Sequence, residues 1–243
     1  GQFGKWLANA RDWSISRNRF WGSPIPVWVS DDPKYPRVDV YGSLDELKAD
    51  FGDYPRDHEG NVNMHRPYID ELTRVNPDDP TGKSHMHRIT DVMDCWFESG
   101  SMSFAQYHYP FENKETFEQH FPCDYIVEYI GQTRGWFYTL LAVSTLLFDK
   151  APYKNCIVLG HVQDKDGQKM SKHKGNVVNP WDALNKQGAD AVRWYFYANS
   201  APWLPSRYYD EAVSEMQRKF MGTLWNTYAF YILYAEIDQF DPT

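Results

Sequence analysis

The richest chemistry in the sequence lies in the segment GHVQDKDGQKMSKHKGN, residues 160–176. Residues 165–174 hold four lysines and one aspartate, a local charge of +3 in a chain whose formal net charge is −8. Ammonium groups on flexible stems suit a polyphosphate whose charge shifts during a reaction. Gly167 and Gly175 provide hinges. The segment predicts a mobile phosphate-binding loop, and the alternative is a solvated basic turn.

The elements before this loop are expected to form a strand, a helix and a second strand. Residues 125–130 are a β-rich run, residues 133–148 an apolar helix, and residues 155–159 a buried-type strand closed by Gly160. Short connections between them indicate a βαβ unit and therefore a parallel sheet. The loop then follows the carboxyl end of a parallel strand, where ligands bind in open α/β sheets.

Further elements flank this unit. The apolar run at residues 25–29 predicts a strand. After the loop, helices are expected at residues 181–187 and 190–199, the first begun by Asn179-Pro180 and closed by Gly188. After Pro205, apolar side chains recur every three or four residues and predict a long amphipathic helix. These are Val213, Met216, Phe220, Leu224 and Tyr228.

Residues 31–88 differ from the rest of the chain. They are rich in Asp, Pro, Gly and His and show little periodicity. One short helix is expected at residues 43–51, where Ser43 as N-cap and Glu46 three residues on form a capping-box pattern. We interpret this region as an insertion on a host domain, and disorder is the alternative.

Composition excludes several classes of protein. With 42% hydrophobic and 24% charged residues the chain is globular rather than disordered. A pI near 5.5 argues against a basic protein that covers nucleic acid without sequence preference. The longest apolar run, residues 136–148, is shorter than the roughly 20 residues of a membrane span, and no signal peptide opens the chain. We expect a soluble, cytoplasmic protein with no membrane partner.

The cysteines and histidines do not predict a metal site. The three cysteines are widely spaced, so we expect buried, reduced thiols and neither a disulfide scaffold nor structural zinc. Four histidines of the insertion have irregular spacing and no cysteine partner, which argues against a metal there. The residues concerned are Cys95, Cys123, Cys156, His58, His65, His85 and His87.

Four ordered motifs carry a family resemblance. Residues 169–172, KMSK, resemble the signature of the class I aminoacyl-tRNA synthetases, and as in that family they follow a strand ending in Gly-His; no Walker sequence or GxGxxG competes. Three further tracts resemble the isoleucine branch of the family, and only residues 31–88 match weakly. They are WSISRNRFWGSPIPVW at 13–28, DCWFESGSMSFAQ at 94–106 and EYIGQTRGWF at 128–137. The valine and leucine branches share parts of this set, but the second tract fits the isoleucine branch best.

The resemblance implies an α/β fold: the second half of a Rossmann-like parallel-sheet nucleotide-binding domain with an irregular insertion. Residues 1–30 and 89–206 would be the catalytic part, residues 31–88 the insertion, and residues 207–243 the start of a helical domain that contacts the anticodon or the tRNA stem. The implied reaction activates isoleucine with ATP, entering as its Mg²⁺ complex, to isoleucyl-adenylate, and transfers the acyl group to tRNA(Ile). The implied partners are tRNA(Ile), isoleucine, ATP and the rest of the same synthetase chain.

The resemblance also assigns the nucleotide site. Lys169 and Lys172 would hold the β- and γ-phosphates of ATP, and Met170 and Ser171 lie between them in the ATP site. Three consecutive residues, Gly160, His161 and Val162, would lie at the adenine and ribose. Glu128 suits ribose hydroxyls or the substrate ammonium, and Gln132 suits the adenylate carbonyl. Satisfied structural roles remain the alternative for His161.

The amino-acid site is assigned in the same way. Trp96 and Trp136 would form flat apolar walls for the isoleucine side chain, with ordinary core packing as the alternative. Arg134 would either fix its loop by a salt bridge or touch the ligand. The bacterial members carry an acid where this sequence has Gly131, which puts one polar contact of the family in question.

One class I signature does not occur in this sequence. The string HIGH belongs to the first half of the fold and supplies imidazoles to the transition state, and no editing domain is recognisable either. We therefore expect this chain, which opens on Gly1 and is expected to be part of a longer protein, to have little or no synthetase activity alone. Two other classes stay open: a non-catalytic RNA- or nucleotide-binding module that uses the KMSK loop, and a structural helical adaptor.

Overall fold

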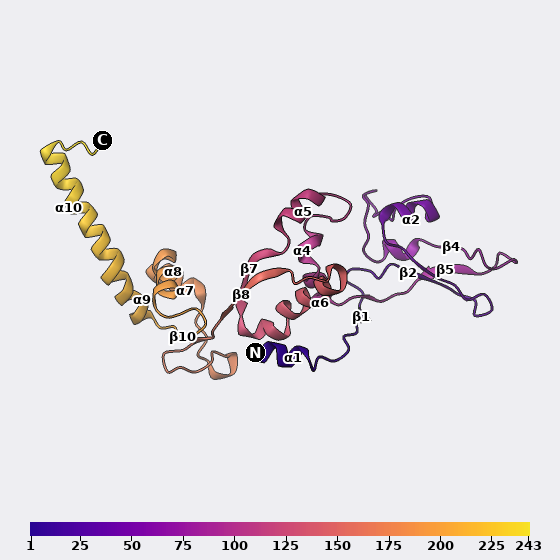
Figure 1. The fold of residues 1–243 in the computed structure, drawn as a ribbon, viewed down its shortest axis with the longest axis horizontal. Coiled ribbons are helices and arrows are strands. Elements are labelled where there is room, and N and C mark those ends of the chain that lie inside the picture. The colour runs from indigo at the N-terminus through magenta and orange to yellow at the C-terminus, as the bar shows by residue number, and fades with distance from the viewer. The chain divides into compact units, whose positions relative to one another are not determined.

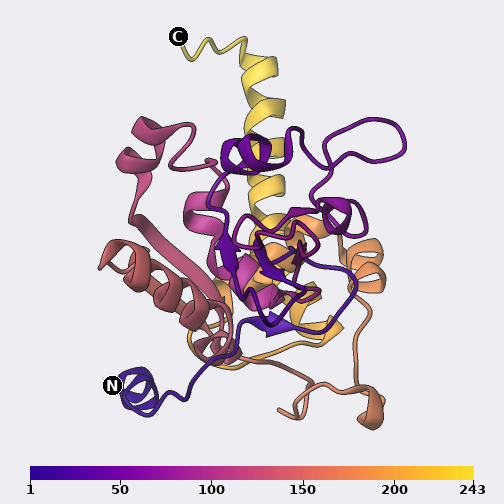
Figure 2. The same cartoon turned by 90° about the vertical axis from the view of Figure 1, so that its right-hand side faces the viewer.

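The computed structural model describes residues 1–243, except for the side chain of Gln2, and the chain divides into two compact units. The first unit contains residues 1–122 and 133–152, and the second contains residues 123–132 and 153–243. Figure 1 follows the chain through its elements, and Figure 2 shows the same ribbon turned by 90°.

An antiparallel sheet dominates one part of the first unit. Its strands are β2 (Val27–Ser30), β3 (Val38–Val40), β4 (Arg74–Val75) and β5 (His85–Arg88), in the order β3-β2-β5-β4. Helix α2 (Leu44–Phe51) lies beside this sheet in both views (Figures 1 and 2). A core of Trp28, Tyr41, Leu47, Ile69 and Met86 joins the sheet, α2 and a 3₁₀ helix at Tyr68–Glu71. Residues 31–88, predicted as an insertion, therefore pack around a core that they share with Trp28 of the preceding segment, and the alternative of disorder was wrong.

Helix α2 confirms the predicted cap. The Ser43 hydroxyl accepts a hydrogen bond from the Glu46 amide at 3.2 Å. The Glu46 carboxylate reaches back to the Gly42 amide at 2.8 Å, one residue before the N-cap. The helix ends at Gly52, whose φ of 86° is left-handed.

The rest of the first unit is mainly helical. Its elements are α1 (Gln2–Leu7), β1 (Ser16–Arg17), β6 (Val92–Met93), α3 (Cys95–Gly100), α4 (Met102–Ala105), α5 (Lys114–His120) and α6 (Trp136–Phe148). Strands β1 and β6 pair antiparallel. Helices α3 and α6 approach closely at Gly100, where a Cβ would lie 2.9 Å from the carbonyl oxygen of Thr139.

The second unit contains the predicted parallel strands. β7 (Cys123–Tyr129) pairs parallel with β8 (Tyr153–Leu159), and α6 lies between them in sequence, which confirms the strand–helix–strand prediction. β9 (Val162–Gln163) and β10 (Ser206–Arg207) form a second parallel pair. The mixed α/β fold class is confirmed.

The helices after the loop follow their sequence signals. They are α7 (Pro180–Gln187), α8 (Ala189–Ala198), α9 (Asp210–Met216), a π-helical turn at Gln217–Gly222 and α10 (Thr223–Asp238). The Asn179 side chain caps α7 by accepting from the Trp181 amide at 3.1 Å, and Gly188 ends the helix. Ala183, Ala191, Tyr195, Tyr208 and Val213 form the core of this unit.

The long C-terminal helix exists, but most of its predicted apolar stripe is not covered. Val213 is fully buried and Met216 packs against the core. Further along, Phe220, Leu224 and Tyr228 are 44%, 59% and 55% exposed. The periodicity therefore predicted the helix correctly, whereas burial ends about one turn after Val213. Among the described residues, every helix is too short or too polar to span a lipid bilayer.

The prediction of buried thiols was wrong. Cys95, Cys123 and Cys156 are all free, and all three are exposed. Cys123 and Cys156 lie on β7 and β8, where most residues are exposed. Cys95 opens the short helix α3. A strand that looks apolar in sequence is buried only where other elements cover both faces of its sheet, and the two-stranded β7–β8 sheet is not covered in this way.

Candidate active site

The predicted phosphate-binding loop follows a tight backbone crossing at the end of β8. At Gly160 a Cβ would lie 2.3 Å from the carbonyl oxygen of Leu204 and 2.7 Å from the nitrogen of Pro205. The Gly160 amide donates to the Pro202 carbonyl at 3.0 Å, and the Ser206 amide donates to the His161 carbonyl at 2.8 Å. The protein's own backbone thus requires a glycine at 160, independently of any nucleotide.

The loop begins as a small hairpin. Gln163 and Lys169 form an antiparallel bridge, and the Asp164 amide donates to the Gln168 carbonyl at 2.9 Å. The turn between them closes with a hydrogen bond of 3.0 Å from the Gly167 amide to the Asp164 carbonyl, and the φ of Gly167 is +78°. This left-handed residue explains the glycine, since few other residues adopt that conformation.

Two polar side chains hold the loop together. The Asp164 carboxylate accepts from the amides of Asp166 and Gln168 at 3.0 and 2.7 Å. The Asn176 side chain donates to the second Asp164 oxygen at 2.7 Å and accepts from the Ser171 amide at 2.9 Å. The bond from Asn176, followed by that from the Gln168 amide, lowers the pKa of Asp164.

The four KMSK residues divide into two kinds. Lys169 and Lys172 are exposed. Met170, by contrast, packs against the core of the second unit. The Ser171 hydroxyl accepts from the Lys174 amide at 3.3 Å and begins a 3₁₀ turn, Lys172–Lys174. The motif therefore presents two ammonium groups to solvent from a backbone that the middle two residues anchor.

The residues predicted around the adenosine meet at the carboxyl ends of β7 and β8. Tyr129 stands opposite Leu159 in the parallel register, so Glu128 and His161 lie near the same edge. The Tyr129 hydroxyl is 3.3 Å from Nε2 of His161, and the two rings meet edge to face at 4.8 Å. The exposed Glu128 carboxylate accepts from the Tyr129 amide at 3.1 Å.

The remaining two residues of this predicted set lie close by in sequence. Gln132 is half-buried in a 3₁₀ turn, Ile130–Arg134, that follows β7. Val162 is 44% exposed in β9. Both belong to the second unit, together with Glu128 and His161.

The two tryptophans predicted to contact the amino acid lie on a single helix pair in the first unit. Trp96 is in the first turn of α3, where its amide donates to Asp94 at 2.7 Å, and it is 42% exposed. Trp136 is the first residue of α6, and its indole donates to the Ser99 carbonyl of α3 at 3.0 Å. Trp136 is therefore half-buried and oriented by α3, whereas the ring of Trp96 remains accessible.

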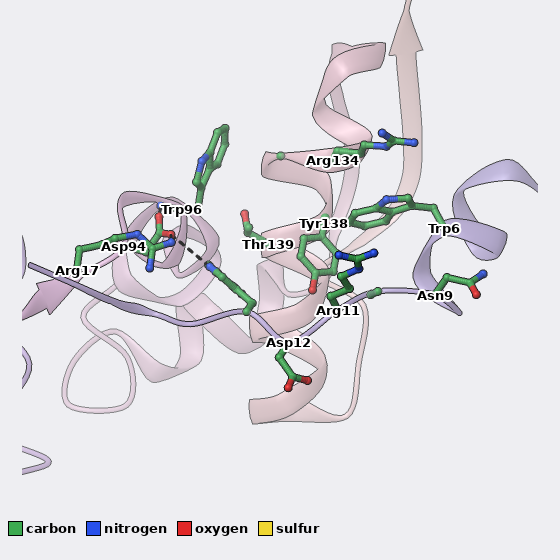
Figure 3. A pocket seen from close by; sticks show the side chains of 13 residues that line it. Trp6, Asn9, Arg11, Asp12, Arg17, Asp94, Trp96, Arg134, Tyr138 and Thr139 are labelled. Carbon is green, nitrogen blue, oxygen red and sulfur yellow. Dashed lines mark hydrogen bonds and ion pairs between the residues drawn. The ribbon is translucent and has the colours of Figure 1, made fainter.

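Trp96 borders a cavity of about 470 Å³ in the first unit (Figure 3). Arg17 and Asp94 form an ion pair in its lining, and the Trp13 indole donates to Asp94 at 3.3 Å. Burial alone would raise the pKa of Asp94, but the hydrogen bonds and the charge of Arg17 outweigh burial and lower it. Arg134 lines the same cavity. The cavity thus combines flat aromatic walls with a fixed carboxylate.

A second hollow of about 500 Å³ is also lined by Trp96. His65 stacks on Trp21 there, with ring centroids 4.2 Å apart. The other histidines of the insertion are dispersed: His58 meets the ring of Tyr68, and His87 lies 3.4 Å from Asp31. Within the part of the chain that the structure describes, no three His, Cys, Asp or Glu side chains group as metal ligands.

Sequence reasoning missed several residues of these sites. Asp164 and Asn176 frame the loop, Tyr129 contacts His161, and Arg17 pairs with Asp94. The order Asp-Lys-Asp-Gly at residues 164–167 was an available turn signal for Asp164. The other contacts join residues that are distant in sequence, so no local sequence pattern could have predicted them.

Comparisons with known proteins agree with one another. Residues 1–204 match the family model of tRNA synthetases class I (I, L, M and V). The chain is 68% identical over 97% of its length to the isoleucine–tRNA ligase of Bifidobacterium longum, and 57% identical over its whole length to that of Clostridium acetobutylicum. It spans about a fifth of these curated relatives, 21% and 22% of their lengths.

Solved structures resemble the chain in fold. Agrobacterium radiobacter K84 LeuRS, in a ternary complex with tRNA and LeuAMS, matches with a TM-score of 0.64 at 21% identity, over 90% of this chain and 29% of that one. Mycobacterium tuberculosis methionyl-tRNA synthetase, in complex with methionyl-adenylate, matches with a TM-score of 0.53 at 17% identity, over 89% of this chain and 31% of that one.

Proposed function

The chain belongs to the class I tRNA synthetases of the I, L, M and V group, and we propose that it is part of an isoleucine–tRNA ligase. Its curated relatives with that name support isoleucine as the amino acid. One structural observation carries the proposal: Lys169 and Lys172 are exposed on a framed loop just after a parallel strand. A ligase that charges tRNA is expected to act in the cytoplasm.

The domain assignment is part of the same proposal. Residues 1–30 and 89–206 supply the catalytic half-domain, residues 31–88 an insertion, and residues 207–243 the start of a helical domain for tRNA. Tyr41, Leu47, Ile69 and Met86 supply most of the core around Trp28, which supports an insertion that folds largely around its own side chains. Its sheet also recruits β2, Val27–Ser30, from the preceding segment.

In the proposed reaction the isoleucine carboxylate attacks the α-phosphate of ATP, which enters with Mg²⁺ as substrate. A carboxylate oxygen bonds to the α-phosphorus while the bond to the β-phosphate oxygen breaks, so pyrophosphate leaves. Lys169 and Lys172 stabilise the negative charge on the departing β- and γ-phosphates. Met170 and Ser171 hold the loop backbone that carries these two lysines. A hydroxyl oxygen at the tRNA 3′ end then bonds to the acyl carbon while the bond from that carbon to the adenylate phosphate oxygen breaks, so AMP leaves.

The adenosine is proposed to bind at the carboxyl ends of β7 and β8. Gly160, His161 and Val162 would contact the adenine and ribose, and Glu128 would accept from ribose hydroxyls or the ammonium of isoleucine. Gln132 would donate to the adenylate carbonyl. The contact of Tyr129 with His161 holds the imidazole in place, which supports a positioned rather than a freely rotating ring.

The isoleucine side chain is proposed to lie against Trp96 and Trp136. Both residues sit on the α3–α6 pair, and the indole hydrogen bond to Ser99 fixes the plane of one of them. Flat apolar walls distinguish isoleucine from valine by one methylene, about 1–3 kcal/mol, a limit of which isoleucine–tRNA ligases are themselves the standard example.

Isoleucine-dependent exchange of pyrophosphate into ATP tests the proposal in the longest natural polypeptide that contains this sequence. Lys169→Ala and Lys172→Ala are each expected to reduce kcat by about 10²-fold, as is usual when one charge-stabilising donor is lost. Lys165→Ala, on the same loop but outside the motif, should change it less than about threefold. Equal losses in all three variants would indicate a general basic surface instead and would contradict the proposed roles.

Residues 1–243 alone are expected to show little or no exchange, because the HIGH half of the site is not in this sequence. Exchange near the rate of a complete enzyme would contradict that expectation. The alternative function, a non-catalytic RNA-binding module, predicts RNA affinity that falls steeply with salt and no preference among aminoacyl-adenylates. A rise in melting temperature with an isoleucyl-adenylate analogue, but not with its leucyl or valyl counterparts, would exclude that alternative.

A further inference from the structure

We infer that Asp164 and Asn176 act as a pair of positioning residues that set the conformation of the KMSK loop for ATP. This inference rests on the proposed function. Neither residue belongs to the four-residue motif, and Asn176 lies 12 residues after Asp164. Between them the two side chains bridge both ends of the loop, so they fix the segment that carries Lys169 and Lys172.

Asn176 uses both ends of its side-chain amide. Its nitrogen donates to Asp164 at 2.7 Å and lies 3.3 Å from the Lys169 carbonyl, while its oxygen accepts from the Ser171 amide at 2.9 Å. It therefore contacts the backbone on each side of Met170. Gly175, with a φ of +64°, turns the chain immediately before it.

Asp164 is the other half of the pair. One carboxylate oxygen accepts from the Asp166 and Gln168 amides and shapes the turn, while the other accepts from Asn176. The turn brings Gln168 into reach of Lys174, whose ammonium donates to it at 3.2 Å. A carboxylate is suited to this position because it accepts several hydrogen bonds at once.

The consequence for catalysis follows from where the lysines are attached. Lys169 carries a carbonyl near Asn176, and Lys172 directly follows the residue whose amide Asn176 binds. Loss of the Asn176 amide therefore frees the backbone of both lysines at once. Since a displacement of about 1 Å at a positioned group can cost up to 10²-fold in rate, the pair should affect kcat rather than the binding of isoleucine.

A double-mutant cycle in the longest natural polypeptide that contains this sequence tests the inference. Asp164→Ala and Asn176→Ala should each lower kcat for pyrophosphate exchange by about 10- to 100-fold. The KM for isoleucine should stay within about twofold. The double variant should be no slower than the slower single variant, because residues that act as a unit are not additive.

A reversed pair provides the rescue that a merely structural defect would not show. In Asn176→Asp two carboxylates face each other and the donor is lost. Adding Asp164→Asn restores a donor from the other side, and this asparagine still has an oxygen for the Gln168 and Asp166 amides. The reversed pair should therefore recover at least about tenfold over Asn176→Asp alone. Asp166→Asn is the matched control, because Asp166 bonds to Asp164 only through its backbone amide.

Hydrogen exchange separates this inference from the proposed function. In Asn176→Ala the Ser171 amide should exchange about fivefold faster or more, because it loses its acceptor, while the Tyr208 amide, bonded to Gln163, should not change. An unchanged Ser171 amide, additive kcat losses, or no rescue by the reversed pair would each overturn the inference. A wild-type protein that catalyses no isoleucine-dependent pyrophosphate exchange would overturn the proposed function, and with it the catalytic role of the pair.

Discussion

The backbone crossing at Gly160 makes the sharpest prediction about stability. A methyl group added by Gly160→Ala would lie 2.3 Å from the Leu204 carbonyl oxygen, 2.4 Å from its carbon and 2.7 Å from the Pro205 nitrogen. All three are backbone atoms and cannot move aside by a rotamer change. Overpacking usually costs about 1–3 kcal/mol, and we expect the upper end, about 3 kcal/mol, because no side chain can yield.

Gly222→Ala is a matched control in the same unit. Gly222 has helical φ and ψ of −62° and −43°, and an added Cβ would meet only the Gln217 carbonyl oxygen, at 3.9 Å. An alanine there should stabilise the protein by about 0.5–1 kcal/mol, since it removes backbone freedom from the unfolded chain. The same chemical change is therefore expected to have opposite signs at the two positions.

Thermal unfolding measures both variants. For a chain of this size about 1 kcal/mol corresponds to roughly 2–4 °C in Tm, so Gly160→Ala should lose roughly 6–12 °C and Gly222→Ala should gain a few degrees. An unchanged Tm for Gly160→Ala would refute the crossing. Unchanged Tm with lost ATP-dependent exchange would show that the glycine serves only the nucleotide.

Three further outcomes follow from other contacts. Gly100→Ala should cost about 1–3 kcal/mol in urea unfolding, because its methyl would meet the Thr139 carbonyl between α3 and α6; a neutral variant would contradict that packing. Burial raises the pKa of Tyr153 from 10.0 to about 12. The folded state therefore favours the neutral phenol, and the stability that this neutral phenol contributes is present below pH 10 and should be lost between pH 10 and 12. Tyr153→Phe should remove this part of the alkaline loss, and an identical pH profile would disprove it. Cys123 and Cys156 are exposed as residues, but partial desolvation raises the pKa of both thiols. Iodoacetamide should therefore modify both more slowly than it modifies free cysteine at pH 8, and equal rates would contradict this.

Local signals predicted the elements that they describe. The Ser43–Glu46 cap and the Asn179-Pro180 start of α7 are interactions between neighbours in sequence, and the structure contains both. The strands around residues 125–130 and 155–159 and their parallel pairing were also predictable, because a helix of fitting length separates them. The two caps depend on residues within a few positions of one another, and the strand pairing depends on the order and length of consecutive elements.

Other features depend on partners that are distant in sequence. The sheet around Trp28 pairs the strand at residues 27–30 with the strand at residues 85–88, and no local sequence pattern predicts that pairing. Exposure of Cys123 and of Leu224 depends on whether another element covers them, which periodicity does not report. From the sequence, the glycine at 160 was explained by close approach of a nucleotide. The structure gives a second reason, because the backbone of Leu204 leaves no room for a Cβ there.

The four residues of the KMSK motif have two different tasks, anchoring the loop backbone and presenting cations. A phosphate-binding loop needs exposed cations, but long exposed side chains on a free backbone would lose much of their conformational entropy when they bind. Here Met170 packs against the core and Ser171 begins a 3₁₀ turn, so the protein's own contacts hold the backbone between the lysines. Lys169 and Lys172 then have only their own side chains to order. The spacing of the motif thus combines two anchors with two ligands, and replacing either anchor should weaken phosphate binding without removing a charge.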